Sequence, residues 1–174
     1  IDRAFLALAY KLNINSGITK EREIVGNIPY ESENKYSAVF YKEEGNASCT
    51  AKGSLEKILE FCDTMMVGNK IKKIDKDLLS KQNEELASNG YRVIALAKGI
   101  KPNFRKKNLY NSEDLPKMIL IGLVGFIDPI RDETISAIKK CNKAGIKVIM
   151  VTGDHPLTSF AIAKELKMVK NYKK

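Results

Sequence analysis

The feature that most constrains the fold is an apolar run at residues 146–151, which a Thr-Gly-Asp tripeptide at 152–154 follows directly. Its β-branched and long apolar side chains predict a strand that is buried on both faces. The preceding residues, 134–144, repeat apolar side chains at helical spacing and stop at Gly145. Helix, buried strand, glycine turn and helix together are typical of half of a doubly wound α/β unit.

The tripeptide after this strand favours the chemistry of phosphates or metals. Ligands of such sheets collect at the carboxyl ends of the strands, against the N-terminus of the next helix. There Thr152 offers a hydroxyl, Gly153 lets a ligand approach the backbone, and Asp154 supplies a carboxylate. A polar turn containing glycine also ends many strands with no ligand nearby, so the tripeptide alone leaves a structural role open.

Charge and cysteine content narrow the class of protein. The chain has 174 residues, with 30 Lys and Arg against 21 Asp and Glu, a net charge of +9. Such a basic balance favours anionic partners, which include nucleotides, nucleic acids and anionic lipids. The three cysteines are odd in number and widely spaced, which predicts free thiols in a reducing compartment and no metal site. The longest apolar stretch, residues 118–127, is well short of the ~20 residues of a membrane-spanning helix.

The pattern of predicted elements changes at residue 128. Before it, short strands follow one another through tight turns, which indicates an antiparallel α+β domain over 1–127. After it, the alternation of helix and strand indicates parallel α/β structure over 128–174. The expected helices cover 3–12 (with Asp2 as N-cap), a short segment capped by Ser54, 75–89 and 134–144. The expected strands cover 23–28, 35–42, 47–51, 91–98, 117–127 and 146–151, with a tight turn at Gly68-Asn69 between two further short strands. Because the chain starts directly on a helical pattern without Met, we expect it to be a fragment.

Three ordered motifs together resemble the cytosolic part of type II P-type cation-transporting ATPases. Residues 145–156 are similar to the T-G-D segment of these pumps. Residues 128–131 are similar to their D-P-P-R hinge, with Ile130 in place of the second proline, which gives Asp128 and Arg131 a hinge role. Residues 52–54 are similar to their K-G-A element, with Ser54 in place of alanine. The resemblance implies a nucleotide-binding domain over 1–127, an antiparallel sheet flanked by helices, followed by a partial phosphorylation domain with a haloacid-dehalogenase-like α/β fold.

The resemblance also implies a set of ATP-binding residues. They are Asp2 beside the adenine amino group, Tyr30 stacked on adenine, Lys35 close to the base, Lys52 and Gly53 in the adenine pocket, and Arg92 against the phosphates. Residue chemistry supports these roles, because an aromatic face can stack on a base and a guanidinium suits phosphate. Structural alternatives remain for three of them: an N-cap for Asp2, a strand-end aromatic for Tyr30, and pairing with a local carboxylate for Arg92.

Two segments that the family needs for phosphoryl transfer do not occur in this sequence. These are D-K-T-G-T, which holds the phosphorylated aspartate, and G-D-G-x-N-D, which holds magnesium. Residues 75–77, Asp-Lys-Asp, lack the Thr-Gly continuation and open a helix. Thr152, Gly153 and Asp154 would therefore only support the phosphate, with the nucleophile and the magnesium ligands outside the chain. We expect the chain alone to be inactive, because phosphoryl transfer requires several positioned parts at once.

In the intact pump, the resemblance implies that ATP bound here phosphorylates an aspartate elsewhere and drives cation transport across a membrane. The partners would be the actuator, phosphorylation and transmembrane domains, and the chain would be a cytosolic domain of an integral membrane protein. Calcium is the first expectation for a pump of this type, but residues 153–156 also resemble sodium/potassium pumps, so the transported cation stays open. One alternative is a soluble phosphatase of the haloacid dehalogenase class, although no nucleophilic aspartate segment is visible. Another is a basic module for nucleic acid or membrane, which lacks any supporting basic–aromatic signature, so no nucleic acid is expected.

Overall fold

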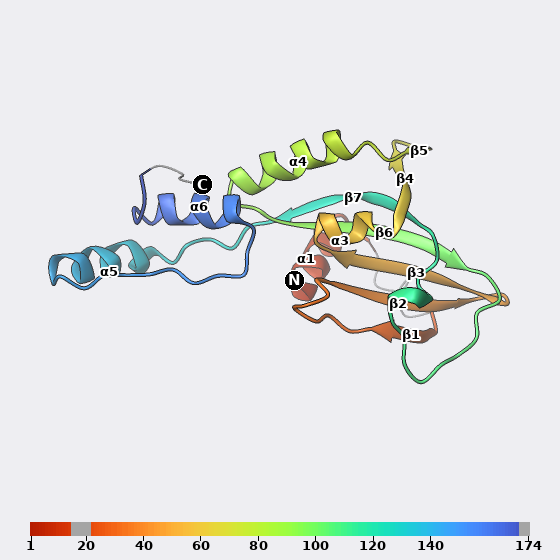
Figure 1. Cartoon of the computed structure of the whole chain (residues 1–174). Helices are drawn as coiled ribbons and strands as arrows, with labels where there is room; N and C mark the ends of the chain where they lie inside the picture. The colour runs from red at the N-terminus through yellow and green to blue at the C-terminus, as the bar shows by residue number, and fades with distance from the viewer. Residues whose placement is uncertain (15–21, 171–174) are drawn as a thin grey trace. The chain divides into compact units, whose positions relative to one another are not determined.

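A computed structural model describes residues 1–14 and 22–170 (Figure 1). Contacts between residues divide the chain into two compact units. The first unit contains Ile1–Lys76 and Ile94–Val124, and the second contains Asp77–Val93 and Gly125–Lys174. The domain boundary expected between residues 127 and 128 stays a prediction.

The first unit is built on a mixed sheet of seven strands in the order β1-β2-β3-β6-β7-β4-β5 (Figure 1). The strands are β1 Ile24–Ile28, β2 Tyr36–Glu43, β3 Asn46–Gly53, β4 Cys62–Val67, β5 Lys70–Lys73, β6 Arg92–Lys101 and β7 Met118–Phe126; the helices are α1 Asp2–Lys11, α3 Leu55–Leu59 and the short η1 Ser112–Asp114. Neighbours β1/β2, β2/β3, β3/β6 and β4/β5 are antiparallel, and β4/β7 is parallel. The expected α+β class is confirmed, and β4/β7 is the parallel pair among these five.

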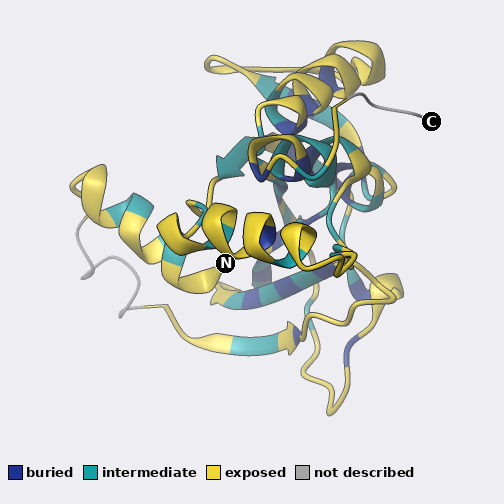
Figure 2. Ribbon diagram, turned by 90° about the vertical axis from the view of Figure 1, so that its left-hand side faces the viewer, coloured by how far each residue is buried: buried dark blue, intermediate teal, exposed yellow. Residues whose placement is uncertain are grey.

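The core of this unit forms where alternate residues of β2 and β3 face the same side of the sheet. In β2 the buried positions are Tyr36, Ala38 and Phe40, and in β3 they are Ala47, Cys49, Ala51 and Gly53. Figure 2 shows such an alternation of buried and intermediate segments, in dark blue and teal, within the sheet. Phe40 is 0% exposed, and its ring centroid lies 5.1 Å from that of Tyr110 and 5.7 Å from that of Phe104. The Tyr110 hydroxyl donates to the backbone carbonyl of Val25 (3.3 Å), so the aromatic cluster also fixes the first strand to the long 102–117 connection.

Two local predictions from the sequence are confirmed, the tight turn at Gly68 and the helix cap at Ser54. Gly68 has a φ of +57° and begins the two-residue connection between β4 and β5. Glycine at the first central position is typical of such tight hairpins. Ser54 is the N-cap of α3, and its hydroxyl accepts a hydrogen bond from the Lys57 amide (3.4 Å).

The described part of the second unit contains the helices α4 Lys76–Ser88, α5 Asp132–Lys143 and α6 Pro156–Glu165. α6 begins with Pro156, whose fixed φ suits a first helical turn, and its N-cap is His155. The His155 Nδ1 accepts from the Leu157 amide (3.3 Å). Thr158 is 2% exposed and donates its hydroxyl hydrogen to the Tyr91 carbonyl (3.0 Å). This buried bond ties α6 to the residue that precedes β6.

The strand expected at residues 146–151 is wrong. The segment has no regular secondary structure, and the side chains of Ile149 and Val151 are 71% and 93% exposed. A strand needs a neighbouring backbone for its amide and carbonyl groups, and no described segment of this chain pairs with these residues. Hydropathy alone therefore does not make a strand here. The parallel α/β arrangement expected after residue 128 is not shown.

The three cysteines are thiols in different surroundings. Cys49 on β3 and Cys62 on β4 are buried in the first unit, and burial raises the pKa of Cys49 to about 12 and that of Cys62 to about 11. Cys141 lies on α5 in the second unit and is partly exposed. Among the described residues, no helix is long and apolar enough to cross a membrane.

Candidate functional site

Lys52 lies near the end of β3, where two residues of α1 hold its side chain. Its ammonium forms an ion pair with the carboxylate of Asp2 and lies 5.3 Å from the centroid of the Phe5 ring. Asp2 and Phe5 are three residues apart, so they share one face of the helix. The side chain of Lys52 is 33% exposed. One cation is thus held by a carboxylate and an aromatic face, while part of it remains accessible from solvent.

The expected N-cap role of Asp2 is wrong. Ile1 is the N-cap of α1 and makes no side-chain capping bond, while Asp2 is the first helical residue. The carboxylate of Asp2 instead accepts a hydrogen bond from Lys52, and this bond, together with the lysine charge, holds the pKa of Asp2 below its usual value. The competing partner for this carboxylate lies fifty residues away in the sequence.

The chain's own backbone packs closely around position 53 and leaves no room for a side chain there. Gly53 lies opposite Tyr36 in the β2/β3 ladder. A Cβ at position 53 would collide with the Lys35 carbonyl oxygen and with the Tyr36 backbone and Cβ. The Lys35 carbonyl also accepts from the Ser54 amide (3.0 Å), and Lys35 itself has a φ of +57°. Whether Gly53 also contacts a nucleotide stays a prediction.

Tyr30 lies in the connection between β1 and β2, at the end of the sheet that carries Lys52. The strand register pairs Ile28 of β1 with Ala38 of β2, and Ala38 with Ala51 of β3. Because β1 and β3 both run antiparallel to β2, Tyr30 and Lys52, which follow Ile28 and Ala51, lie at the same end of the sheet. The Tyr30 side chain is 61% exposed. An exposed ring at this end can stack on a planar ligand. The sheet therefore brings Tyr30, Lys35 and Lys52 to one end, with Asp2 joined through its ion pair.

A separate constellation lies in the second unit. Arg92, the first residue of β6, forms an ion pair with Asp154, although 62 residues separate them. The Asp154 amide donates to the Thr152 hydroxyl oxygen (3.1 Å), which closes the turn before α6. Apart from Gly153 itself and its two chain neighbours, no described residue has an atom within 4 Å of the place where a Cβ of Gly153 would stand. The turn thus offers an open backbone beside a carboxylate that an arginine already neutralises.

Sequence reasoning did not foresee the partnership of Arg92 with Asp154. It assigned Arg92 to phosphate and left open a local carboxylate as an alternative partner. The actual carboxylate is distant in sequence, and no short motif signals such a contact. The hinge candidates Asp128 and Arg131 are both exposed, and Arg131 is the N-cap residue of α5 without a side-chain capping bond.

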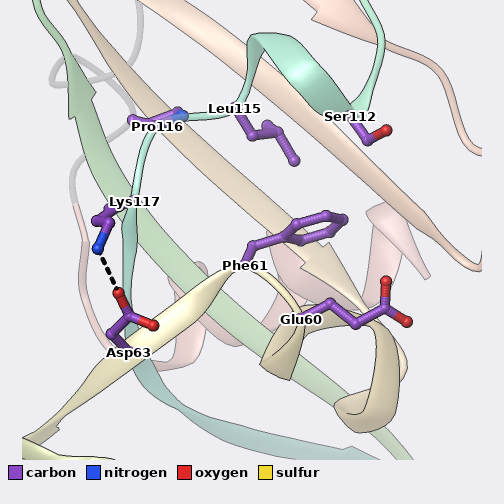
Figure 3. Close-up of a pocket in the computed structure, with 7 residues that line it drawn as sticks. All are labelled: Glu60, Phe61, Asp63, Ser112, Leu115, Pro116 and Lys117. Carbon is purple, nitrogen blue, oxygen red and sulfur yellow. Dashed lines mark ion pairs between the residues drawn. The ribbon is translucent and has the colours of Figure 1, made fainter.

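A hollow of about 310 Å³ in the first unit contains none of the predicted site residues. Figure 3 shows its lining, which consists of Glu60, Phe61, Asp63, Ser112, Leu115, Pro116 and Lys117. Its charges are already paired, because Lys117 contacts Asp63 (3.0 Å) and Glu60 accepts from Lys57 (2.7 Å). The Lys52 end of the sheet remains the candidate ligand site, because Tyr30, Lys35 and Lys52 meet there. Among the described residues, no group of three or more His, Cys, Asp or Glu is placed to hold a metal ion.

Comparison with known proteins decides the family. The family model described as "P-type ATPase, cytoplasmic domain N" matches residues 1–133. The chain belongs to the P-type ATPase family. One relative is the sodium/potassium exporting P-type ATPase cta3 of Schizosaccharomyces pombe, 38% identical over 159 residues, covering 87% of this chain and 15% of the relative. The sodium/potassium-transporting ATPase subunit alpha of Drosophila melanogaster is 34% identical over 177 residues, covering 94% of this chain and 17% of the relative.

A third relative supports the same P-type ATPase assignment. The potassium-transporting ATPase alpha chain 2 of Oryctolagus cuniculus is 35% identical over 165 residues, covering 87% of this chain and 15% of the relative. The chain therefore spans under a fifth of the length of these P-type ATPases. The family membership and the nucleotide-binding domain expected from the sequence are confirmed, and the relatives are ATPases by name.

Proposed function

We propose that this P-type ATPase domain binds ATP at the Lys52 end of its sheet. The observation that carries the proposal is the arrangement of Lys52 between the Asp2 carboxylate and the Phe5 ring, beside Lys35 and Gly53. In the intact pump, the bound ATP would phosphorylate an aspartate outside this chain and drive cation transport.

The chemistry of these side chains suits an adenine base. The Asp2 carboxylate accepts hydrogen bonds and the Lys52 ammonium donates them, which matches an exocyclic amino group and a neighbouring ring nitrogen. The exposed Tyr30 ring offers a face for stacking at the same end of the sheet. When the base binds, Asp2 and Lys52 would each contact the base in addition to contacting each other.

Taken by itself, the second unit carries residues that we propose support a phosphate in the intact pump. Thr152, Gly153 and Asp154 present a hydroxyl, an open backbone and a carboxylate before α6. Arg92 has a side chain 52% exposed, so its guanidinium can also face a phosphate while it contacts Asp154. Magnesium in the intact pump would neutralise the developing phosphate charge, and its ligands would come from outside this chain.

An ATP titration followed by amide NMR tests the proposal. Stacking and a few hydrogen bonds should give about 4–5 kcal/mol, which corresponds to a dissociation constant in the high-micromolar to millimolar range. We expect shifts at Tyr30 and Lys52, with weaker binding of GTP. Equal affinities for ATP and GTP, or shifts confined to other residues, would contradict an adenine site here.

We further propose that the transported cation is monovalent. Two of the relatives described above are named for sodium and potassium, and the third for potassium. The intact protein in sealed vesicles should hydrolyse ATP in response to sodium or potassium. Stimulation by calcium alone would overturn this part of the proposal and leave the ATP site unaffected.

A further inference from the structure

The edge strand β5 gathers positive charge on the first unit. All four of its residues are exposed, and three of them are Lys70, Lys72 and Lys73. Lys76 follows closely, and Asp75 is the one acidic residue between positions 67 and 76. No ion pair between described residues involves the three lysines of the strand. We propose that β5 binds an extended acidic segment of a partner protein, which joins the sheet as an additional strand.

The backbone of β5 has one side open for such pairing. β5 is the last strand of the sheet, and among the strands that the structure describes it pairs with β4 alone. The Ile74 amide donates inward, to the Asp63 carbonyl (3.3 Å). Backbone groups of successive residues in an antiparallel strand point to alternate sides. The amides and carbonyls of Ile71 and Lys73 therefore point away from β4, where they can pair with an incoming strand.

The side chains define what kind of strand can pair there. Lysines on an edge strand repel basic strands, and they disfavour pairing with neutral strands because their charges would lose water, so they protect the edge from aggregation. A strand with carboxylates reverses that effect, because opposite charges on neighbouring strands attract. Ile71 is 57% exposed and interrupts the lysines, so it favours an apolar side chain opposite it. A partner strand that runs antiparallel to β5 would thus carry acidic residues opposite Lys73, Lys72 and Lys70. It would carry an apolar residue opposite Ile71.

The probe is a synthetic peptide with Glu-Glu-Val-Glu at its centre, titrated into the whole chain and followed by amide NMR. We expect saturable shifts at Ile71 and Lys73, and weaker binding as salt rises. A peptide with lysine in place of each glutamate should not bind. A peptide methylated on the backbone nitrogen of its valine keeps the charge and loses a ladder donor, so it should bind at least tenfold more weakly. Equal binding of the methylated peptide would overturn the proposal.

Matched charge reversals locate the effect. Lys70→Glu, Lys72→Glu and Lys73→Glu combined should abolish peptide binding. The control combines Lys139→Glu, Lys140→Glu and Lys143→Glu on α5, which are exposed and change the net charge equally. This control should bind the acidic peptide as the unmodified chain does, and equal losses in both variants would overturn the proposal. Should the triple β5 variant fail to fold, Lys73→Glu alone provides the same comparison with Lys140→Glu.

Two further measurements separate other occupants of this surface. Vesicles containing phosphatidylserine test an anionic membrane, and sedimentation of the chain over a range of concentrations tests a second copy. Vesicle binding lost in the β5 variant, without peptide binding, would replace the proposal with a membrane contact. Self-association lost in that variant, again without peptide binding, would replace it with a dimer.

Discussion

The carbonyl oxygen of Lys35 occupies the space that a side chain on Gly53 would need. We predict that Gly53→Ala lowers the free energy of unfolding by about 1–3 kcal/mol, because neither this backbone carbonyl nor Tyr36 can move aside cheaply. Urea unfolding measures the change. Gly153→Ala is the control: its Cβ would enter open space, so stability should stay within about 0.5 kcal/mol. Equal stability of both variants would show that the Lys35 carbonyl is not a fixed obstacle.

Lys52→Ala and Tyr30→Ala should each weaken ATP binding several-fold. Both side chains are partly or largely solvent-exposed, so their loss opens no core cavity, and thermal stability should change little. Phe40→Ala should behave in the opposite way and cost about 3–5 kcal/mol of stability, because Phe40 is fully buried among aromatic rings. Calorimetric titration and thermal unfolding measure the two effects. Unfolding caused by Lys52→Ala would assign the residue to structure instead.

Asp114 should make the stability of the first unit depend on pH. Its carboxylate accepts hydrogen bonds from the Lys107 ammonium and the Asn111 amide, and the lysine contact is the main reason that its pKa lies below the usual 3.8. A lowered folded-state pKa means that the carboxylate stabilises the fold above 3.8 and loses this effect as pH falls through the folded-state pKa.

The variant Asp114→Asn isolates this contribution. At neutral pH it should cost about 1–3 kcal/mol, and the difference from the unmodified chain should shrink as the pH falls below 3.8. Urea unfolding across the acidic range measures it. Asp63→Asn is the control, since the Asp63–Lys117 pair is largely exposed and should contribute about 0–1 kcal/mol. A pH-independent difference for Asp114→Asn would rule out the carboxylate charge as the cause.

The 174-residue chain should form no acyl phosphate with ATP and magnesium. The D-K-T-G-T nucleophile segment does not occur in it, and Asp154 is held by Arg92. Positioning contributes roughly 7–11 kcal/mol only where both reacting groups are present. Incubation with γ-labelled ATP, followed by acid precipitation and hydroxylamine treatment, checks this. Label on Asp154, Asp128 or Asp75 would support the phosphatase alternative.

Short-range signals in the sequence predicted much of the first unit. Ser54 caps a helix and Gly68 turns a hairpin because each effect depends on a few neighbouring residues. The strand expected at residues 146–151 failed because a strand depends on a partner that local sequence does not reveal. The α+β class and its strand alternation were therefore predictable, and the structure of that later segment was not.

The same distinction between short-range and long-range interactions applies to the candidate sites. Residue type and motif position indicated Lys52, Tyr30 and Arg92, but ion pairs are set by the folded chain. Lys52 meets Asp2 across fifty residues, and Arg92 meets Asp154 across 62. Neither contact has a fixed spacing that a motif could encode. The ligand roles of these residues stay predictions until a nucleotide is titrated.

Because the three cysteines differ in burial, a thiol-specific label can be directed to one of them. Burial keeps Cys49 and Cys62 protonated and covered at neutral pH, while the partly exposed Cys141 on α5 can meet a thiol-specific dye. A fluorophore or spin label would therefore attach to the second unit of an otherwise unmodified chain. Its signal would report local motion there, and later reaction of the other two thiols would time the opening of the first unit.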